Sequence, residues 1–329
     1  MGFRMRKSFK VVPGVRLNVS KSGFGASVGG KGGRYSVHSS GRRTVSAGSG
    51  VIPGVYYQQS VGGGRSARAQ APAQVPAKIP KPGLFAPKGE KELYNAIFKA
   101  RSVAAIRAVG DTHPDFRIAS YSLAGFMLDD DDSAQAKSLL TLVFDQGVDP
   151  AVDPFVVKYI AGTRVKLPIA AGVSAELSLS RDAVGLSLAE LLQEEGDLSG
   201  AIDVVERLEP SAYTGVSLAE LYLLNDRPDE VIELTEGLTN EDDATAILLV
   251  FRGAAFRREG FHDAAHEALK EALRSRSRAA PIRHLALSER AANYLAQGKK
   301  AMARKDLERI LAEDSDYEGV RERLAELAS

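Results

Sequence analysis

The sequence has no cysteine and no tryptophan, and none of its 329 residues lie in an apolar run long enough to cross a membrane. A chain without thiols forms no disulfide, uses no thiolate nucleophile and holds no cysteine-ligated zinc. A membrane-spanning helix needs about 18 or more consecutive apolar residues. The first ten residues, MGFRMRKSFK, also lack the apolar centre of a secretory signal peptide. We therefore expect a cytoplasmic protein with no membrane span.

Acidic residues are absent from the first 89 residues, which carry 15 lysines and arginines. All 42 aspartates and glutamates lie from Glu90 onward, together with the other 28 basic residues. The net charge of +1 therefore hides a segment of +15 joined to a segment of −14. Charge separated in this way indicates that the two segments have different partners or attract each other.

The most informative pattern is a helical repeat in the C-terminal part of the chain. Ser187–Glu206 and Ser217–Glu236 are identical at seven of twenty positions, with an offset of thirty residues. Two further copies are centred on Gly260 and Gly298. Each copy contains an amphipathic helix, a stop at Gly or Asn-Asp, and a second helix. Self-similarity at this period predicts stacked helix pairs.

Small and aromatic residues recur at fixed spacing inside these copies. A small residue is followed by an aromatic three later, a glycine four after that and an alanine five further on, as in Gly253, Phe256, Gly260 and Ala265, and in Ala291, Tyr294, Gly298 and Ala303. This spacing resembles the tetratricopeptide repeat. The unit at Ala212–Thr239 is degenerate, because Asp226 replaces the glycine and Val231 the alanine. The last helix, Tyr317–Leu327, is expected to cap the array.

Short β-type runs between Gly, Ser and Pro turns fill the first 60 residues. The expected strands lie in Phe3–Val12, Val15–Ser20, Gly25–Gly29, Arg34–His38, Thr44–Ala47 and Val55–Gln58. The motifs GFRMRKS at 2–8, PGVRLN at 13–18, SKSG at 20–23 and GRRT at 41–44 make this segment resemble DUF4236, a family without an established activity. So small a unit has a thin core, so we expect it to dimerise, pair edge to edge or pack on a partner.

The middle of the chain joins these two parts. Residues 61–89 are rich in Gly, Ala, Pro and Lys, a composition that favours an extended linker. Helical periodicity begins at Glu90 and continues through Glu90–Val109, Phe116–Leu128 and Ser133–Phe144, which we interpret as a divergent first repeat. Phe155–Ser180 interrupts this pattern, and alternating apolar residues predict a β-hairpin at 163–180.

The predicted fold class is α+β and multidomain. It combines a small basic all-β, Gly-rich domain at 1–60, a flexible linker at 61–89 and a mainly α-helical tetratricopeptide-like solenoid at 90–329 with an inserted β-hairpin. The clearest repeats lie at 182–329.

Three patterns that resemble ligand sites are better explained by ordinary structure. The segment GASVGGKG at 25–32 lacks the Ser or Thr that should follow Lys31 in a phosphate-binding loop, so a β-turn is favoured. His262 and His266 share a helix face that suits zinc, but no third ligand is evident, which favours exposed repeat surface. Asp129–Asp132 lacks the glycine and distant glutamate of a calcium loop and marks a helix boundary instead. With no nucleophile–base pair evident, we expect no enzyme activity, cofactor or metal.

The resemblance to tetratricopeptide repeats implies that set positions of each first helix line a concave groove for a protein or peptide. The carried-over positions are Glu190, Gln193, Glu220, Leu223, Arg257, Arg258 and Ser288, together with Leu186, Val216, Val250, Ala254, Leu285, Ala292 and Leu295. The Lys/Asn arrangement of that family's carboxylate clamp is absent. We therefore hypothesise a non-enzymatic scaffold or adaptor whose array binds a protein partner.

The basic residues of the N-terminal segment form a second candidate site. Their main members are Arg4, Arg6, Lys7, Lys10, Arg16, Lys21, Arg42 and Arg43. Such a cluster can neutralise nucleic acid or another polyanion, with steep salt dependence, and nearby Phe and Tyr residues can stack on bases. Two alternatives stay open: the cluster balances the acidic array, in cis or in a neighbouring copy, or it contacts another protein or the cell envelope. The segment then anchors the protein or forms a homo-oligomer.

Overall fold

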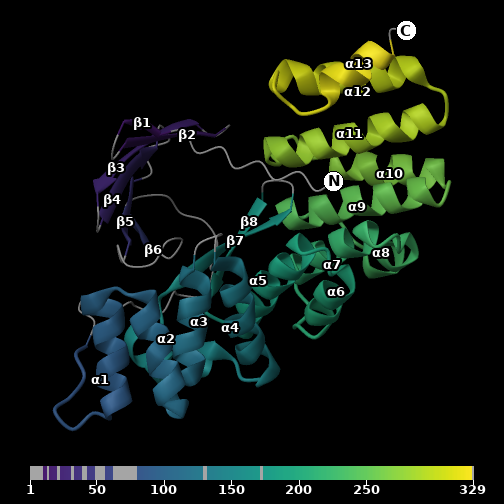
Figure 1. Cartoon of the computed structure of the whole chain (residues 1–329). Helices are drawn as coiled ribbons and strands as arrows, with labels where there is room; N and C mark the ends of the chain where they lie inside the picture. Colours follow the sequence, from purple (N-terminus) through teal and green to yellow (C-terminus); the bar gives the residue numbers. More distant parts are fainter. Residues whose placement is uncertain are drawn as a thin grey trace. The chain divides into compact units, whose positions relative to one another are not determined.

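The computed structural model describes residues 10–12, 15–20, 23–30, 33–38, 43–48, 56–61, 80–128, 132–170 and 173–327. Figure 1 shows the chain with its helices and strands labelled. The helices fall into two compact units, one holding the helices up to Glu194 and the other those from Leu198 onward. Each unit is described separately below.

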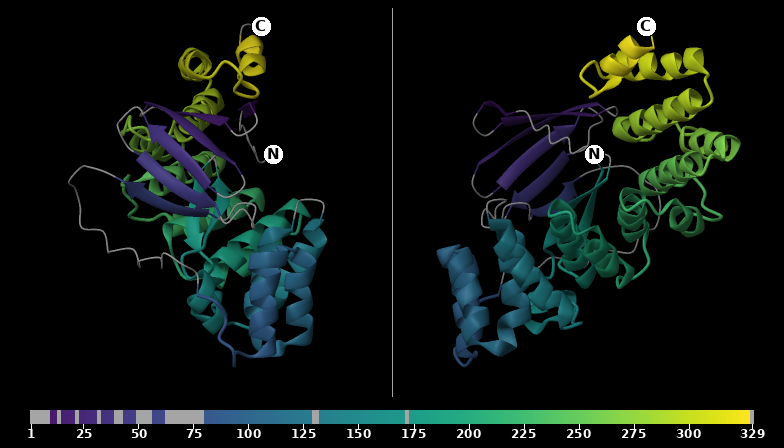
Figure 2. Two further views of the ribbon diagram at one scale, coloured as in Figure 1. Left: turned by 90° about the vertical axis from the view of Figure 1, so that its left-hand side faces the viewer. Right: turned by 45° about the vertical axis from the view of Figure 1, so that its right-hand side comes forward.

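Six strands in the N-terminal segment form one antiparallel meander, in the order β1-β2-β3-β4-β5-β6. They are β1 (Lys10–Val12), β2 (Val15–Ser20), β3 (Gly23–Gly30), β4 (Gly33–His38), β5 (Arg43–Gly48) and β6 (Tyr56–Val61). The sheet is visible in both views of Figure 2. The independence of this segment as an all-β domain stays a prediction.

The first helical unit begins two residues before the predicted start at Glu90. Its helices are α1 (Lys88–Asn95), α2 (Val103–Thr112), α3 (Arg117–Met127), α4 (Ser133–Asp145) and α5 (Arg181–Glu194). Within the helical stretch expected over Glu90–Val109, a π-helical turn after α1 ends in the left-handed Arg101, at φ 55°, and separates α1 from α2. Ser102 then starts α2 by accepting a hydrogen bond from the Ala105 N–H at 3.2 Å.

The predicted hairpin is present as β7 (Arg164–Ala170) paired with β8 (Val173–Ser178). However, the segment from Phe155 to Ile160 is still helical and ends in a π-helical turn, so the helical pattern breaks later than expected. Asp153 starts this turn by accepting hydrogen bonds from the backbone N–H groups of Phe155 and Val156. Burial is the main cause that raises the pKa of the Asp153 carboxyl.

The second unit contains the predicted repeats. Its helices are α6 (Leu198–Glu206), α7 (Ala212–Leu224), α8 (Pro228–Leu234), α9 (Asp243–Arg258), α10 (His262–Ala272), α11 (Ala280–Ala296), α12 (Lys300–Glu313) and α13 (Val320–Glu326). Helices α7 with α8, α9 with α10 and α11 with α12 form successive antiparallel pairs, which Figure 1 shows stacked along the unit. The repeat prediction is confirmed for these pairs.

The turns between paired helices share one backbone geometry. The N–H just after each turn donates to the carbonyl five residues earlier at 2.8 Å: Arg227 to Tyr222, Phe261 to Phe256, and Lys299 to Tyr294. The preceding residue is left-handed in each case, at φ 55° for Asp226, 79° for Gly260 and 72° for Gly298. This six-to-one hydrogen bond with a left-handed residue satisfies the last carbonyls of a helix. The degenerate unit therefore keeps the turn although aspartate has replaced glycine.

The helices of each pair approach closely at small residues. Ala265, Ala291 and Ala303 are fully buried, and Val231 is buried in the same role in the degenerate unit. At Gly253 a Cβ atom would lie 2.5 Å from Cγ of Leu269, far inside van der Waals contact. The spacing rule read from the sequence therefore marks the positions where the two helices of a pair touch.

The last helix adds to the core of the final pair. Val320 of α13 is fully buried and clusters with Leu287, Leu307 and Ile310 of α11 and α12. The end of the array thus carries apolar contacts on its inner side, as expected of a capping helix.

Candidate partner surface on the first helices

The polar residues at the end of α9 bind the neighbouring first helix. Arg258 donates from Nη1 to the backbone carbonyl of Leu223, at the C-terminal end of α7, and its Nη1 lies 3.9 Å from Oδ1 of Asp226. A guanidinium at a helix C-terminus faces carbonyls that have no partner within the helix. Arg258 thereby joins α9 to α7.

Arg257 points to the other neighbour. Its Nη2 lies 3.0 Å from Oε2 of Glu289 on α11, and both side chains are about one quarter exposed, at 26% and 25%. The Nε atom of Arg257 is buried without a hydrogen-bond partner. An exposed ion pair stabilises by at most about 1 kcal/mol, but this pair is partly desolvated and ties two repeats together.

Ser288, a predicted groove residue on α11, has a partner in the last helix. Its Oγ accepts a hydrogen bond of 2.9 Å from Nη1 of Arg323 on α13. The contacts of Arg258, Arg257 and Arg323 link α7, α9, α11 and α13 in sequence. We call the residues that make them the interhelix seam: Leu223, Asp226, Arg257, Arg258, Ser288, Glu289 and Arg323.

The other predicted groove residues divide by burial. Five are buried: Leu186, Val216, Leu223, Val250 and Ala254. Val250, for example, belongs to a core cluster with Leu249, Leu269 and Ala286. The half-buried ones are Glu190, Gln193, Glu220, Leu285, Ala292 and Leu295. Of these, Glu190 and Gln193 lie on α5, in the first helical unit. The groove assignment itself stays a prediction, and only the half-buried residues offer surface to a partner.

Tyr222 on α7 is a buried tyrosine with an acidic partner. Its hydroxyl donates to Oε1 of Glu206 on α6 at 2.7 Å, and the Arg227 guanidinium lies 4.6 Å from its ring centre. Burial, followed by this hydrogen bond, raises the pKa of Tyr222 to about 12. The phenol therefore stays protonated in the folded protein and anchors α7 to the preceding helix.

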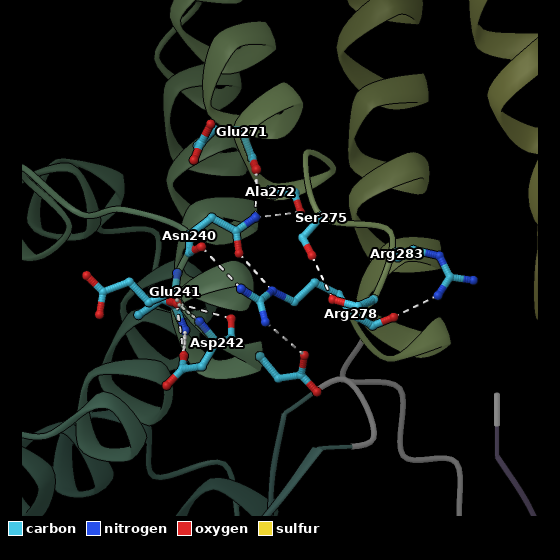
Figure 3. Close-up of polar contacts among 11 residues, drawn as sticks. Asn240, Glu241, Asp242, Glu271, Ala272, Ser275, Arg278 and Arg283 are labelled. Carbon is cyan, nitrogen blue, oxygen red and sulfur yellow. Dashed lines mark hydrogen bonds and ion pairs between the residues drawn. The ribbon is translucent and has the colours of Figure 1, made fainter. Parts of the chain in front are cut away.

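A polar network at the loop edge of the repeats has no counterpart in the sequence patterns (Figure 3). Arg278, in the loop before α11, donates from Nε to Oδ1 of Asn240 at 2.8 Å and from Nη2 to the Asn240 carbonyl at 3.1 Å. Asn240 is itself 7% exposed, and its amide nitrogen donates to the carbonyls of Glu271 and Ala272 at the end of α10. The Asn240 side chain thus donates hydrogen bonds to carbonyls at the end of α10 and accepts one from Arg278 in the loop before α11.

This network continues into the last pair. Arg283 donates from Nη1 to the Arg278 carbonyl at 2.7 Å and from Nη2 to Glu313 on α12. His284 also approaches Glu313, with Nε2 and Oε2 3.3 Å apart. Arg283 and His284 are each only 4% exposed. Arg278 is 38 residues from Asn240 in the sequence. Arg283 is 30 residues and His284 is 29 residues from Glu313. No local sequence motif therefore predicts these contacts.

The two histidines that suggested zinc lie where α10 meets α11. Nδ1 of His262 is 2.9 Å from Oδ1 of the buried Asn293, whose amide nitrogen donates back to the His262 carbonyl. The His266 ring is 5.6 Å from that of Tyr294. Both histidines are half-buried, so their description as exposed repeat surface is corrected. Within the described residues, no three potential ligands gather around a metal position.

Comparison with known families identifies the N-terminal segment. Residues 3–58 match DUF4236, described as "Protein of unknown function". A comparison with the curated proteins found no match. Among the described helices, none is both long enough and apolar enough to span a bilayer.

Solved structures share the helical architecture. The N-terminal domain of the EccA1 ATPase from the ESX-1 secretion system of Mycobacterium tuberculosis is 15% identical, with a TM-score of 0.53, and the match covers 70% of this chain and 84% of that one. The tetratricopeptide repeat (TPR) protein TTC0263 of Thermus thermophilus is 14% identical over 69% of this chain and 99% of that one, with a TM-score of 0.39. A tetratricopeptide repeat protein of Parabacteroides merdae ATCC 43184 is 12% identical over 73% and 96%, with a TM-score of 0.33. At 15% identity the likeness to the EccA1 domain is one of fold alone.

The predicted polyanion contacts lie in the DUF4236 segment. Lys10, Arg16 and Arg43 lie in β1, β2 and β5, and the register pairs Lys10 with Arg16. The remaining candidates lie outside the described residues: Arg4, Arg6, Lys7, Lys21 and Arg42. Lys31 and Asp129–Asp131 also lie outside them, whereas Asp132 directly precedes α4.

Proposed function

We propose that this protein is a non-enzymatic interaction scaffold with three parts: the basic segment 1–60, the linker 61–89 and the helical array 90–329. The array binds a protein segment along its first helices, and the basic segment anchors or oligomerises the chain. The observation that supports this most directly is the interhelix seam, which fixes α7, α9, α11 and α13 beside one another. On α11, next to seam residues Ser288 and Glu289, Leu285 and Ala292 are half-buried and so partly exposed.

Ala292 is the best probe of this surface. It is half-buried on α11, at a carried-over groove position, and it has no polar side chain whose loss would break a bond. Ala292→Arg adds a long charged side chain beside the seam. The matched control is Ala301→Arg on α12, where the alanine is exposed on the second helix of the same pair.

The test selects peptides from a displayed random library on the full chain and measures their affinity by fluorescence polarisation. We expect Ala292→Arg to weaken binding of the selected peptides at least tenfold and Ala301→Arg to leave it within twofold. Selection of no peptide, or equal effects of the two substitutions, would contradict a binding role for the first helices. Circular dichroism checks that both variants keep the helical content of the parent.

The charge of the DUF4236 segment supports a second candidate, binding of nucleic acid or another polyanion. The first 89 residues carry +15 without any acid. Binding through several phosphate contacts weakens steeply with salt, by about 10³-fold or more between 50 and 200 mM for six contacts. The probe is a labelled single-stranded oligonucleotide. Replacing Lys10 and Arg16 by serine should weaken binding several-fold, whereas replacing the exposed array pair Lys299 and Lys300 should not. Absence of binding at low salt would remove this candidate.

A further inference from the structure

The register of the N-terminal meander sorts its residues into two contrasting sets. Val15 pairs with Val28, Val28 with Tyr35 and Tyr35 with Val45, so these four form one apolar row across β2 to β5, which ends at Gln59 on β6. Successive residues of a strand belong to opposite faces, and directly paired residues belong to the same face. The whole row therefore lies on one face of the sheet.

The adjacent row on that face is also mostly apolar. It joins Leu17, Ala26 and Val37 and ends in Arg43, which pairs with Val61. Arg43 is the exception in this row. We call the face that holds these two rows the apolar face.

The opposite face has a different composition. One of its rows crosses all six strands: Lys10, Arg16, Ser27, Ser36, Thr44 and Ser60. This row contains hydroxyl and basic residues only. We call this the polar face, and its charge is positive because the first 60 residues contain no acid.

A sheet with one apolar face needs a second layer to cover it. The described elements between residues 10 and 61 are all strands of this one sheet, so no described element of this segment supplies such a layer. The nearest apolar side chains in the described part of the linker, Leu84 and Phe85, are 83% and 96% exposed. Within the described residues of the segment and linker, no element is therefore available as the covering layer.

Charge decides between the available occupants. The array carries −14, so it attracts the basic polar face and not the apolar one. Two copies of the sheet repel each other through their polar faces. They can stack only with the apolar faces together, as the two layers of a β-sandwich about 10 Å apart. That arrangement also places the two cationic faces outward and farthest from each other.

The available area suits such a dimer. Six strands about 4.8 Å apart and about six residues long give each face about 600 Å². Two faces together remove about 1,200 Å² from water, the lower end of specific protein interfaces. A single sheet of this size is marginal alone, and pairing supplies the missing core.

We propose that two copies of this chain dimerise by packing the apolar faces of their DUF4236 sheets against each other. This deepens the oligomerising role proposed above and does not depend on what the array binds. The dimer carries two helical arrays and two basic outer faces.

The absence of cysteine makes the test direct, because a single introduced cysteine is the only thiol in the chain. Full-length variants carry one cysteine on the apolar face (Ala26→Cys, Val28→Cys or Val37→Cys) or on the polar face (Ser27→Cys or Ser36→Cys). Mild oxidation at micromolar protein should cross-link the apolar-face variants into disulfide dimers and leave the polar-face variants monomeric on denaturing gels. These substitutions are small enough to preserve the fold.

Sedimentation velocity gives an independent readout. The parent should sediment as a dimer, Val28→Lys should shift it to monomer, and Ser27→Lys, the adjacent residue on the opposite face, should not. A monomeric parent would overturn the proposal. In that case, protection of the Val28→Cys thiol from maleimide would assign the face to the chain's own array, and protection only with anionic vesicles would assign it to a lipid surface. A monomeric parent would not change the expected result of the peptide-binding test on the array. The dimer proposal and the partner-binding proposal can therefore be refuted independently.

Discussion

Gly253→Ala and Gly215→Ala make the same chemical change in two first helices with opposite expected results. Both glycines lie inside helices, α9 and α7, at ordinary negative φ. Replacing a helical glycine by alanine stabilises a helix by about 1 kcal/mol. The outcome then depends on what the new methyl group meets.

At Gly253 the methyl group has no space. It would lie 2.5 Å from Cγ of Leu269 and 2.9 and 3.2 Å from its two Cδ atoms. Leu269 is fully buried in its cluster, so its branched end cannot move out of the way. Overpacking of this kind costs about 1–3 kcal/mol. After the gain in helix propensity, we expect Gly253→Ala to destabilise α9 and α10 by up to about 2 kcal/mol.

At Gly215 the nearest atoms are Cδ1 and Cδ2 of Leu248, at 3.7 and 3.9 Å, which is ordinary contact. Gly215→Ala should therefore stabilise α7 by about 0.5–1 kcal/mol. The chain has two compact units, so a global unfolding curve mixes their transitions. Hydrogen exchange followed by mass spectrometry on peptides from α7, α9 and α10 reports the local free energies instead.

A second substitution tests the cause. Leu269→Val shortens the side chain that Gly253→Ala strikes, so the double variant should be more stable than the sum of the single effects by about 1 kcal/mol. If Gly253→Ala stabilised α9 as Gly215→Ala stabilises α7, the close approach would not exist. If the effects of Gly253→Ala and Leu269→Val on stability simply added, the new methyl group at residue 253 would not clash with Leu269.

Three further outcomes follow from single side chains. Asp226→Gly should stabilise the α7–α8 turn by about 0.5–1 kcal/mol, measured by hydrogen exchange, because glycine adopts the left-handed conformation without the steric cost that a side chain carries. The pKa of Tyr222 is raised from 10 in the unfolded chain to about 12 in the folded protein, so its burial stabilises the fold fully below pH 10. As the pH rises from about 10 to about 12, the free energy of unfolding should fall by about 2–3 kcal/mol. Tyr222→Phe should remove that alkaline loss in urea titrations at about pH 9 and about pH 11.5, and an equal loss in both proteins would contradict the assignment. Asn240→Ala should destabilise the loop network by about 2–3 kcal/mol, since it removes the side-chain partner of Arg278 Nε and of the carbonyls at the end of α10, whereas the exposed Asn225→Ala should cost less than about 0.5 kcal/mol.

The architecture of the repeats could be predicted because it depends on local rules. Gly260 and Gly298 end helices through their own backbone freedom, and Ala265 and Ala303 fall at a fixed distance from them. Asp226 adopts the same left-handed conformation at a steric cost that glycine does not have, because the packing of α7 and α8 requires the same turn there. Arg101 shows the limit, because nothing in its chemistry favours a left-handed conformation and the break at this residue could not be expected.

The contacts of the candidate site could not be predicted in the same way. Arg278 and Asn240 are 38 residues apart, and both are polar residues in loops that periodicity does not describe. Val250 illustrates a different failure. The repeat spacing identifies where helices cross, but it does not say which of the remaining positions stay open, and α9 is buried around most of its circumference. Burial of that kind depends on all neighbouring helices together.

The seam changes how the partner surface has to be tested. Reversing the charge of Arg257 and Arg258 is the obvious experiment on a groove of mixed charge. However, Arg258→Glu would place a carboxylate against the Leu223 carbonyl and beside Asp226, at a helix end that favours cations. Arg257→Glu would face Glu289 across a partly buried contact. Either variant separates neighbouring first helices, so lost binding would report a loosened array and not a lost contact. Ala292→Arg removes no bond, and for that reason only its effect, compared with Ala301→Arg, can locate a partner on the first helices.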